Sequence, residues 1–303
     1  MSSAVDISKL PVVRGEYKFD ENLSKYTWFN VGGPAEVLFL PADEDDLCYF
    51  LQQKPQDIDV FILGGGSNIL VRDGGIAGVV IKLKSESFSN YHLQDNLLYV
   101  GAGMRNLTMR QIIEKNALGG LEFICSIPGS IGGMIRTNAG CFGSDIASVL
   151  QKARVCDSNG RIFDVPVSDF HFKYRHSEFP SDWIVLGIYL KYTPDTTENV
   201  KKIIADHMQY RQEHQPKHVR TAGSTFKNPQ GYKAWQLIKA ANADSIQVGG
   251  AKMSDMHCNF LVNDGTATAA DIENLIYQVV DKVKEKSGIT LDLEVKIIGQ
   301  KVK

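Results

Sequence analysis

The chain has 303 residues, a formal net charge of −2, 43% hydrophobic and 22% charged residues. These values are typical of a globular protein with one large or two smaller domains. The near-neutral charge argues against the broad basic surface of a nucleic-acid-binding protein. No apolar run approaches the roughly 20 residues that span a bilayer, and the first residues lack the basic and apolar regions of a signal peptide. We therefore expect a cytoplasmic protein with no nucleic-acid or membrane partner.

The five cysteines are scattered along the chain and include no C-x-x-C pair. This pattern predicts neither a disulfide framework nor a zinc site. His257 and Cys258 are neighbours whose side chains could bind a metal, but no further ligands stand at suitable spacing. We interpret both residues as structural and expect no metal.

The first two thirds of the chain alternate short apolar runs, glycines and amphipathic segments. Helices are predicted at 43–53 and 107–116. Strands are predicted at 35–42, 59–66, 77–83, 96–103, within 152–165 and at 183–192.

The sequence pattern changes near residue 194, after which long helical patterns predominate. Helices are predicted at 198–212 and 233–241, and a third begins at a capping box of Thr268 and Asp271 and ends at Gly288. The following segment, 289–297, alternates apolar and polar residues and predicts a strand. We therefore divide the chain into domains at 22–193 and 194–303.

Glycines cluster at 64–68, 101–103, 129–133 and 138–143. The run Gly64–Gly66 follows an apolar strand, but Ile69 stands where a Rossmann fingerprint requires its third glycine. No Gly-Lys-Ser/Thr follows, so a P-loop is also excluded. Each cluster alone is best interpreted as a tight turn. Four clusters in one half of the chain favour a dinucleotide, whose phosphates need close backbone N–H groups.

Six motifs occur in an order that resembles the UDP-N-acetylenolpyruvoylglucosamine reductase (UDP-N-acetylmuramate dehydrogenase) family. They are TWFNVGGPAE, LGGGSNILV, IPGSIGG, NAGCFG, YRHSEF and AGSTFKNP. The resemblance runs from about Thr27 to Glu294 and favours the family's shorter, type II form, because the region after Tyr192 has no room for an extra substrate-covering loop. The segment GGMIRTNAG departs from many relatives, which leaves the packing near the cofactor open.

The resemblance implies an α+β fold: a two-subdomain FAD-binding domain of the vanillyl-alcohol-oxidase (PCMH) type and a C-terminal α+β substrate-binding domain. It implies non-covalent FAD, with NADPH as hydride donor and a UDP-sugar as substrate. The implied FAD-binding residues are Gly64, Gly65, Gly66, Ser67, Asn68, Gly129, Ser130, Gly133, Asn138 and Ala139.

The resemblance also implies three catalytic residues, Arg175, Ser224 and Glu294. Arg175 would stabilise the charge that develops on the substrate carboxylate, Ser224 would donate the proton, and Glu294 would assist. Considered singly, Arg175 is also consistent with a surface ion pair to Glu178. Likewise, Ser224 alone fits a turn and Glu294 alone a solvated carboxylate.

Four polar residues flank the Ser224 loop and are implied, more loosely, to bind the substrate: Arg211, Gln215, Lys227 and Asn228. Reduction of the enolpyruvyl ether to UDP-N-acetylmuramate, a step of peptidoglycan precursor synthesis, is the expected activity. We expect a monomer. Two alternatives are an FAD-dependent oxidase of the same fold and a catalytically inactive nucleotide-binding module.

Overall fold

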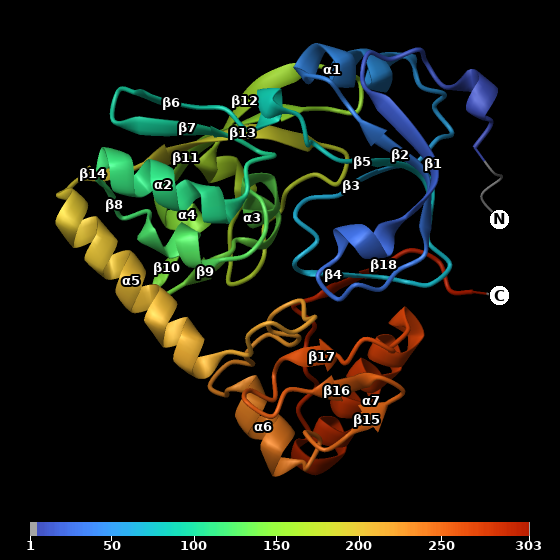
Figure 1. Cartoon of the computed structure of the whole chain (residues 1–303), viewed down its shortest axis with the longest axis vertical. Helices are drawn as coiled ribbons and strands as arrows, with labels where there is room; N and C mark the ends of the chain where they lie inside the picture. Colours follow the sequence, from blue (N-terminus) through green and yellow to red (C-terminus); the bar gives the residue numbers. More distant parts are fainter. Residues whose placement is uncertain (1–4, 303) are drawn as a thin grey trace. The chain divides into compact units, whose positions relative to one another are not determined.

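The structure is a computed structural model that describes residues 5–302, and it divides into two compact units (Figure 1). Unit 1 comprises the chain up to Phe19 together with 37–65 and 78–211, and unit 2 comprises 20–36, 66–77 and the chain from Gln212 onward. Residues 1–4 lie outside the described residues. The prediction that the chain has no signal peptide depends partly on them. The division of the chain into two domains at residue 194 stays a prediction. The two units are defined by packing, and each combines segments that are separate in the sequence.

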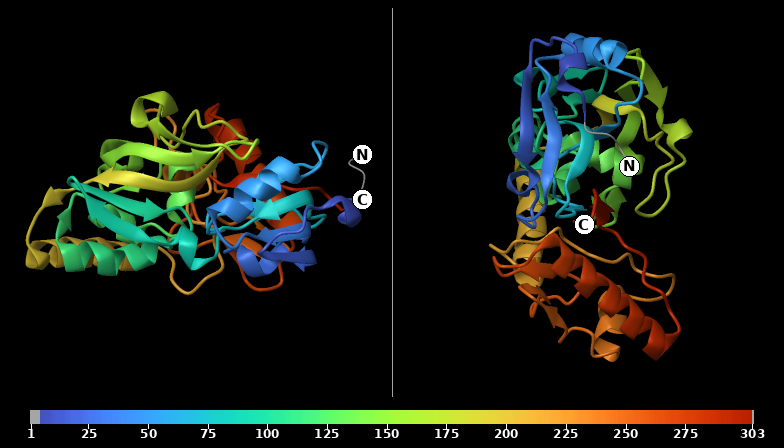
Figure 2. Two further views of the ribbon diagram at one scale, coloured as in Figure 1. Left: turned by 90° about the horizontal axis from the view of Figure 1, so that it is seen from above. Right: turned by 90° about the vertical axis from the view of Figure 1, so that its right-hand side faces the viewer.

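The larger sheet of unit 1 is antiparallel, with strand order β12-β11-β13-β7-β6. Strands β7, β11, β12 and β13 overlap the predicted strand segments, whereas β6 was not predicted. In the sheet, β11 and the central strand β13 run side by side (Figure 2). The bounds are β6 Tyr91–Gln94, β7 Leu97–Gly101, β11 Leu150–Cys156, β12 Ile162–Pro166 and β13 Ile184–Lys191.

A second sheet has the order β1-β2-β5-β3, in which β3 and β5 are parallel. Its strands are β1 Glu16–Asn22, β2 Pro34–Leu40, β3 Val60–Ile62 and β5 Ile76–Ile81. Helix α1 (Glu44–Gln53) packs Leu47 and Phe50 onto this sheet. The Asp43 side chain caps α1 by accepting the Asp46 N–H at 2.9 Å, as the acidic start of the predicted helix suggests.

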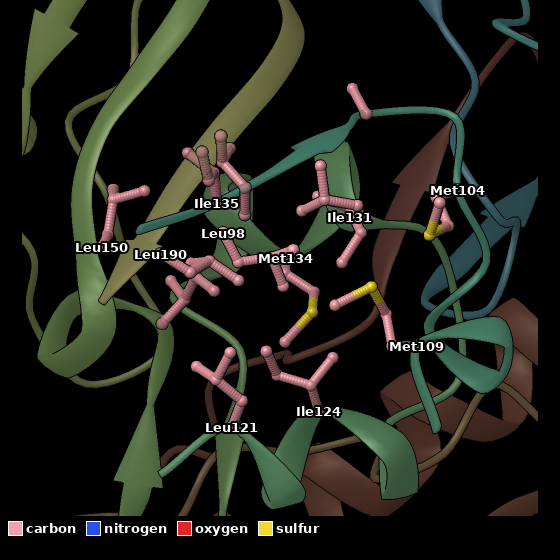
Figure 3. Packing of buried hydrophobic residues seen from close by; sticks show 14 of the residues in the cluster. Leu98, Met104, Met109, Leu121, Ile124, Ile131, Met134, Ile135, Leu150 and Leu190 are labelled. Atoms are coloured by element: carbon pink, nitrogen blue, oxygen red, sulfur yellow. The ribbon is translucent and has the colours of Figure 1, made fainter. Parts of the chain in front are cut away.

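Short helices cover the larger sheet. Helix α3 (Ile131–Thr137) places Ile131, Met134 and Ile135 in one apolar cluster with Leu98 of β7 and Leu190 of β13 (Figure 3). The remaining elements of this part are α2 Asn106–Asn116, α4 Ile146–Val149, β8 Leu118–Gly119, β9 Gly140–Cys141, β10 Ser144–Asp145 and β14 Thr193–Pro194. Short 3₁₀ turns are η1 Ile7–Lys9, η3 Glu86–Phe88, η4 Glu122–Ser126 and η5 Val167–Phe170, and η2 Leu23–Tyr26 lies in unit 2. Helix α5 (Thr197–His214) follows β14.

Unit 2 is organised around α7 (Ala269–Ser287), which contacts α6 and the strands β15 and β16 (Figure 1). The predicted capping box is present, and the apolar stripe of α7 is fully buried. Arg72, which directly follows β4, forms an ion pair with Glu273 of α7, with Nε 2.8 Å from Oε2, and the guanidinium lowers the pKa of Glu273. The other elements are α6 Ala234–Ala240, β4 Ile69–Val71, β15 Gln247–Val248, β16 Ala251–Met253, β17 Leu261–Asn263 and β18 Lys296–Ile298.

The strand predicted at 289–297 is largely wrong. Only β18 is a strand, and it pairs in parallel with β4. The chain bends at Glu294 and Val295 because the carbonyl of Thr225 accepts both of their N–H groups, at 2.8 and 3.4 Å. Burial still follows the predicted alternation at Leu291 and Val295, which lie in the unit 2 core. Across residues 5–302, we find no helix with both the length and the apolar character needed to span a membrane.

Removing the cap of α7 should destabilise unit 2. The Thr268 hydroxyl accepts the Asp271 N–H at 3.0 Å, and Thr268→Ala should lower the free energy of unfolding by about 1 kcal/mol. Urea unfolding followed by circular dichroism measures this change. Thr290→Ala, at an exposed position outside any helix, is the control. Equal midpoints for the two variants would contradict the proposed contribution of the cap.

Candidate active site

Two glycine loops of unit 1 touch through their backbones. A Cβ on Gly65 would lie 2.6 Å from the Cα of Gly129 and 2.9 Å from the backbone nitrogen of Ser130. Real Cβ atoms do not approach backbone this closely, so Gly65 has to be glycine. A Cβ on Gly64 would lie 3.0 Å from the Ser130 hydroxyl. The structure therefore brings together Gly64, Gly65, Gly129 and Ser130, all four predicted to bind the cofactor.

A buried ammonium group reinforces this loop pair. Lys82, which directly follows β5, donates to the Gly64 carbonyl at 2.6 Å. Burial, and to a smaller extent the positive charges of Arg105 and Lys84, lower the pKa of Lys82 to about 8. Arg105 in turn forms an isolated bridge with Ser130. Positive charge is thus concentrated around backbone groups predicted to meet a diphosphate, a complementarity that favours an anionic ligand.

Asn106, like Lys82, belongs to this region and was not predicted from the sequence. It is fully buried at the start of α2, and its N–H donates to the Gly129 carbonyl at 3.1 Å. Neither polar atom of its side chain has a hydrogen-bond partner, and a buried polar group without a partner is unfavourable. A polar ligand or bound water would remove this cost. The glycine loops, the nearby cations and Asn106 together fit a dinucleotide such as FAD.

Asn138 ends α3 in the left-handed conformation, with φ 43°. Its side-chain amide donates to Asp145 and to the Lys173 carbonyl, both at 3.1 Å, and its oxygen accepts the Ala147 N–H at 3.1 Å. The side chain is therefore used within the protein. The backbone groups of Ala139 also bond within the unit. Cofactor contacts of Asn138 and Ala139, like those of Gly133 inside α3, stay predictions.

Arg175 lies in a turn that Lys173 and His176 close with two backbone hydrogen bonds. Its φ of 52° is rarely adopted by a residue with a side chain. The guanidinium donates to the carbonyls of Gly140 at 2.5 Å and Asn138 at 3.5 Å. Glu178, the ion-pair partner that the sequence alone suggested for Arg175, has an ion pair with Lys173 at 3.4 Å.

Arg136 belongs to the GGMIRTNAG segment, which departs from many relatives, and its contacts show one structural role of this segment. Its guanidinium donates to the carbonyls of Pro180, Ser181 and Trp183 and lies 4.2 Å from the Phe179 ring centre. Burial lowers the pKa of Arg136 to about 10. This side chain therefore fixes the chain segment that follows the Arg175 turn.

In unit 2, the structure joins two of the three predicted catalytic residues. Ser224 precedes Thr225, whose carbonyl accepts the Glu294 N–H at 2.8 Å. Glu294 also touches the glycine-run segment, since the Asn68 side chain donates to the Glu294 carbonyl at 3.1 Å. The Asn68 carbonyl accepts the Lys296 N–H at 3.0 Å. Residues 66–68, 224 and 294 therefore converge, although they are far apart in sequence.

The other predicted site residues of unit 2 lie on the same segments. Gly66 has φ 68°, and its carbonyl accepts the Trp28 N–H at 3.0 Å, with Ser67 next in the chain. The Lys227 N–H donates to the Asp292 carbonyl at 2.8 Å. The Asn228 side chain caps α6 by accepting the Ala234 N–H at 3.0 Å. Gln215 lies just after α5 and is half-buried.

Arg211 is assigned to unit 1, whereas Gln215, Lys227 and Asn228 are assigned to unit 2. It donates to the Ser126 carbonyl, and burial lowers its pKa. Near it in sequence, the His207 ring stacks on Phe142 with a centroid distance of 3.9 Å. These aromatic rings add a flat apolar surface that the sequence did not single out.

His257 and Cys258 make local contacts in unit 2. Nδ1 of His257 accepts the Asn259 N–H at 3.2 Å, and Sγ of Cys258 donates to the Trp235 carbonyl at 3.2 Å. Over residues 5–302, no three His, Cys, Asp or Glu side chains gather in a way that could bind a metal ion.

Two family models match the chain. Residues 35–166 match the FAD binding domain model, and residues 215–298 match that of the UDP-N-acetylenolpyruvoylglucosamine reductase C-terminal domain. Over 296 residues the chain is 44% identical to the UDP-N-acetylenolpyruvoylglucosamine reductase of Gluconobacter oxydans, covering 97% of this chain and 96% of the relative. The chain belongs to the UDP-N-acetylenolpyruvoylglucosamine reductase family.

Further relatives agree with this assignment. The enzyme of that name from Parvibaculum lavamentivorans is 44% identical over 98% of this chain and 96% of its own length. The crystal structure of UDP-N-acetylenolpyruvylglucosamine reductase from Thermus caldophilus superposes with a TM-score of 0.81 at 32% identity, covering 94% of this chain and 99% of that one. The predicted family and the α+β fold with an FAD-binding domain and a C-terminal domain are confirmed.

The close contact at Gly65 leads to a test of the cofactor site. Gly65→Val should give folded protein with little FAD, because the added side chain forces the Gly129 loop away. The ratio of flavin to protein absorbance after purification measures this. Gly120→Asn is the control, since a Cβ there meets nothing within 4 Å and Asn tolerates its left-handed backbone. A full flavin complement in Gly65→Val would show that the loop pair does not bind FAD.

Proposed function

We propose that Ser224, Glu294 and Arg175 carry out the reduction of the enolpyruvyl double bond of UDP-N-acetylenolpyruvoylglucosamine. The activity itself follows from family membership: the chain is an FAD-dependent oxidoreductase of peptidoglycan precursor synthesis, with NADPH as hydride donor. The observation that supports the residue assignment is the hydrogen bond from the Glu294 N–H to the Thr225 carbonyl. It fixes the predicted proton donor and the predicted carboxylate on adjacent chain segments.

The substrate's chemistry defines what these residues have to do. Reducing an enolpyruvyl group adds a hydride to one carbon and a proton to the carbon next to the carboxylate, and FAD, when bound, supplies the hydride chemistry. Negative charge then develops on the carboxylate as in an enolate. A fixed guanidinium stabilises such charge, a role for Arg175. Ser224 donates the proton to the neighbouring carbon, with Glu294 assisting as a donor or by positioning.

The cofactor is held by backbone and not by large side chains. Gly64, Gly65, Gly129 and Ser130 supply close N–H groups in unit 1, and Lys82 supplies positive charge beside them. Gly66, Ser67 and Asn68 continue the same run in unit 2. Helix α3, which begins after Ser130, would place Gly133, Asn138 and Ala139 along the rest of the FAD molecule. Gly65 fits this assignment only because it has no side chain.

The substrate diphosphate and sugar are assigned to Arg211, Gln215, Lys227 and Asn228. Two cations suit the negative charge of a diphosphate. Lys227 follows Ser224 within three residues, so a bound diphosphate at Lys227 would lie near the reacting group. Asn228 already caps α6 with its oxygen, which leaves its amide nitrogen for the ligand.

We further propose that the chain acts in the cytoplasm as a monomer, without nucleic acid, and with domains at 22–193 and 194–303. An FAD-dependent oxidase of the same fold is less consistent with the paired Ser224 and Glu294 segments, because oxygen reduction needs no proton donor for an enolpyruvyl carbon. An inactive nucleotide-binding module would have no use for the strained backbone at Arg175.

Ser224→Ala tests the proton donor. Loss of a general acid should slow substrate-driven reoxidation of pre-reduced flavin by about 10²–10⁴-fold, with little change in substrate affinity. Stopped-flow absorbance under anaerobic conditions measures the rate. Ser224→Cys, which retains a transferable proton, should recover part of it. Near-normal reoxidation in Ser224→Ala would remove this serine from the mechanism.

Arg175→Ala tests the electrostatic role. Flavin bleaching by NADPH should be retained, because that half-reaction needs no stabilised substrate carboxylate. Reoxidation by substrate should slow by about 10²–10³-fold. Arg161→Ala, which removes an exposed guanidinium of the same unit, should leave both rates unchanged. An equal loss of bleaching in Arg175→Ala would assign the residue to cofactor binding or folding instead.

A further inference from the structure

Asn259 is a buried residue of unit 2 that the proposed mechanism does not use. It lies between β16 and β17, and only 5% of it is exposed. Its backbone N–H donates to Nδ1 of His257 at 3.2 Å. Its carbonyl accepts the N–H of Thr225 at 2.8 Å. Asn259 is therefore attached to the residue that follows the proposed proton donor.

The side chain of Asn259 pairs with the main chain of Phe226 at two points. Its oxygen accepts the Phe226 N–H at 3.0 Å, and its nitrogen donates to the Phe226 carbonyl at 2.9 Å. A carboxamide has one donor and one acceptor in this arrangement, so it imitates the backbone of a neighbouring β-strand. Aspartate lacks the donor, and an apolar side chain lacks both groups.

The opposite side of the same segment pairs with the chain around Glu294. Phe226 forms an isolated antiparallel bridge with Leu293. The Lys227 N–H donates to the Asp292 carbonyl at 2.8 Å, and the Thr225 carbonyl accepts the Glu294 N–H at 2.8 Å. The segment from Ser224 to Lys227 is therefore fixed from both sides, by Asn259 on one and by 292–294 on the other.

We propose that Asn259 is a positioning residue that sets the register of Ser224 relative to Glu294. This inference rests on the proposed role of Ser224. Phe226 is buried, with 1% exposed, so its polar groups have to be paired within the protein. If Asn259 no longer pairs them, the segment shifts to find other partners and moves Ser224 with it. A displacement of about 1 Å at a reacting group can cost about 10²-fold in rate.

The test compares Asn259→Asp and Asn259→Ala with the wild-type holoenzyme. Asn259→Asp keeps the size and the acceptor but loses the donor to Phe226. Asn259→Ala removes both the donor and the acceptor to Phe226 and introduces no charge, so it provides a second variant if the first does not fold. For both, substrate-driven reoxidation should slow by about 10²-fold. The rate of bleaching by NADPH and the substrate Kd should stay near wild-type values.

Asn263→Asp is the matched control. Asn263 is equally buried in unit 2, accepts the N–H groups of Gly265 and Ala267, and donates to the Phe29 carbonyl at 2.8 Å. The substitution removes the same kind of buried donor without touching the Ser224 segment. It should lower the Tm by a similar amount and leave reoxidation unchanged. Equal reoxidation rates in the Asn259 and Asn263 variants would overturn the positioning role.

A double variant separates this inference from the proposed function. If Asn259 acts through Ser224, then Asn259→Ala should add no further slowing to Ser224→Ala, because the two residues act as one unit. Additive slowing would overturn the inference while leaving Ser224 as proton donor. Fast reoxidation in Ser224→Ala alone would instead overturn the proposed function. Equal slowing of both half-reactions in Asn259→Ala would show a general structural role and also contradict positioning.

Discussion

Close approach of one backbone segment to another is the constraint on which both units depend. In unit 1, Gly65 meets Gly129 at a distance that excludes any side chain. In unit 2, Gly75 approaches the carbonyl of Pro34 so closely that a Cβ would lie 2.0 Å from it. The contact at Gly65 leaves the two glycine loops close together and without shielding side chains, which is the arrangement that the proposed diphosphate site needs. Glycine at positions 65 and 75 is thus a requirement of the backbone packing.

The polar residues around the site bind mainly to the protein itself. Asn138, Asn68 and Asn259 each connect two segments through their side chains. They fix the backbone beside Arg175, Glu294 and Ser224, respectively. A carboxamide suits this work because it donates and accepts at once and carries no charge to be desolvated. The proposed reacting groups therefore lie on irregular backbone that is held by several hydrogen bonds, which is how a site on loops becomes rigid.

Helices and strands with a strong periodic pattern could be predicted from the sequence, and the irregular ones could not. Helix α7 has its capping box and apolar stripe where the sequence places them. The segment after it shows why alternation can mislead: burial alternates at Leu291 and Val295, yet the Thr225 carbonyl draws the chain into a bend at Glu294. Thr225 precedes Glu294 by about 70 residues in the sequence. No local sequence pattern could therefore reveal the bend. The same holds for the cap that Asp73 adds to the α7 N-terminus by accepting the N–H groups of Ala269 and Ala270.

The sequence by itself determined the family and the cofactor class and suggested the residues of the proposed site, because glycine runs and short polar motifs have few other uses in that order. Tertiary structure alone decided which of these residues meet. It joined Ser224 to Glu294 through Thr225 and showed that the Asn138 side chain is occupied within unit 1. It also placed Lys82 and Asn106 beside the glycine loops of unit 1, and Asn259 beside the Ser224 segment of unit 2, although each looks ordinary in sequence. Hydrogen bonds and burial depend on partners that are distant in the chain, and this is why they appear only once the chain is folded.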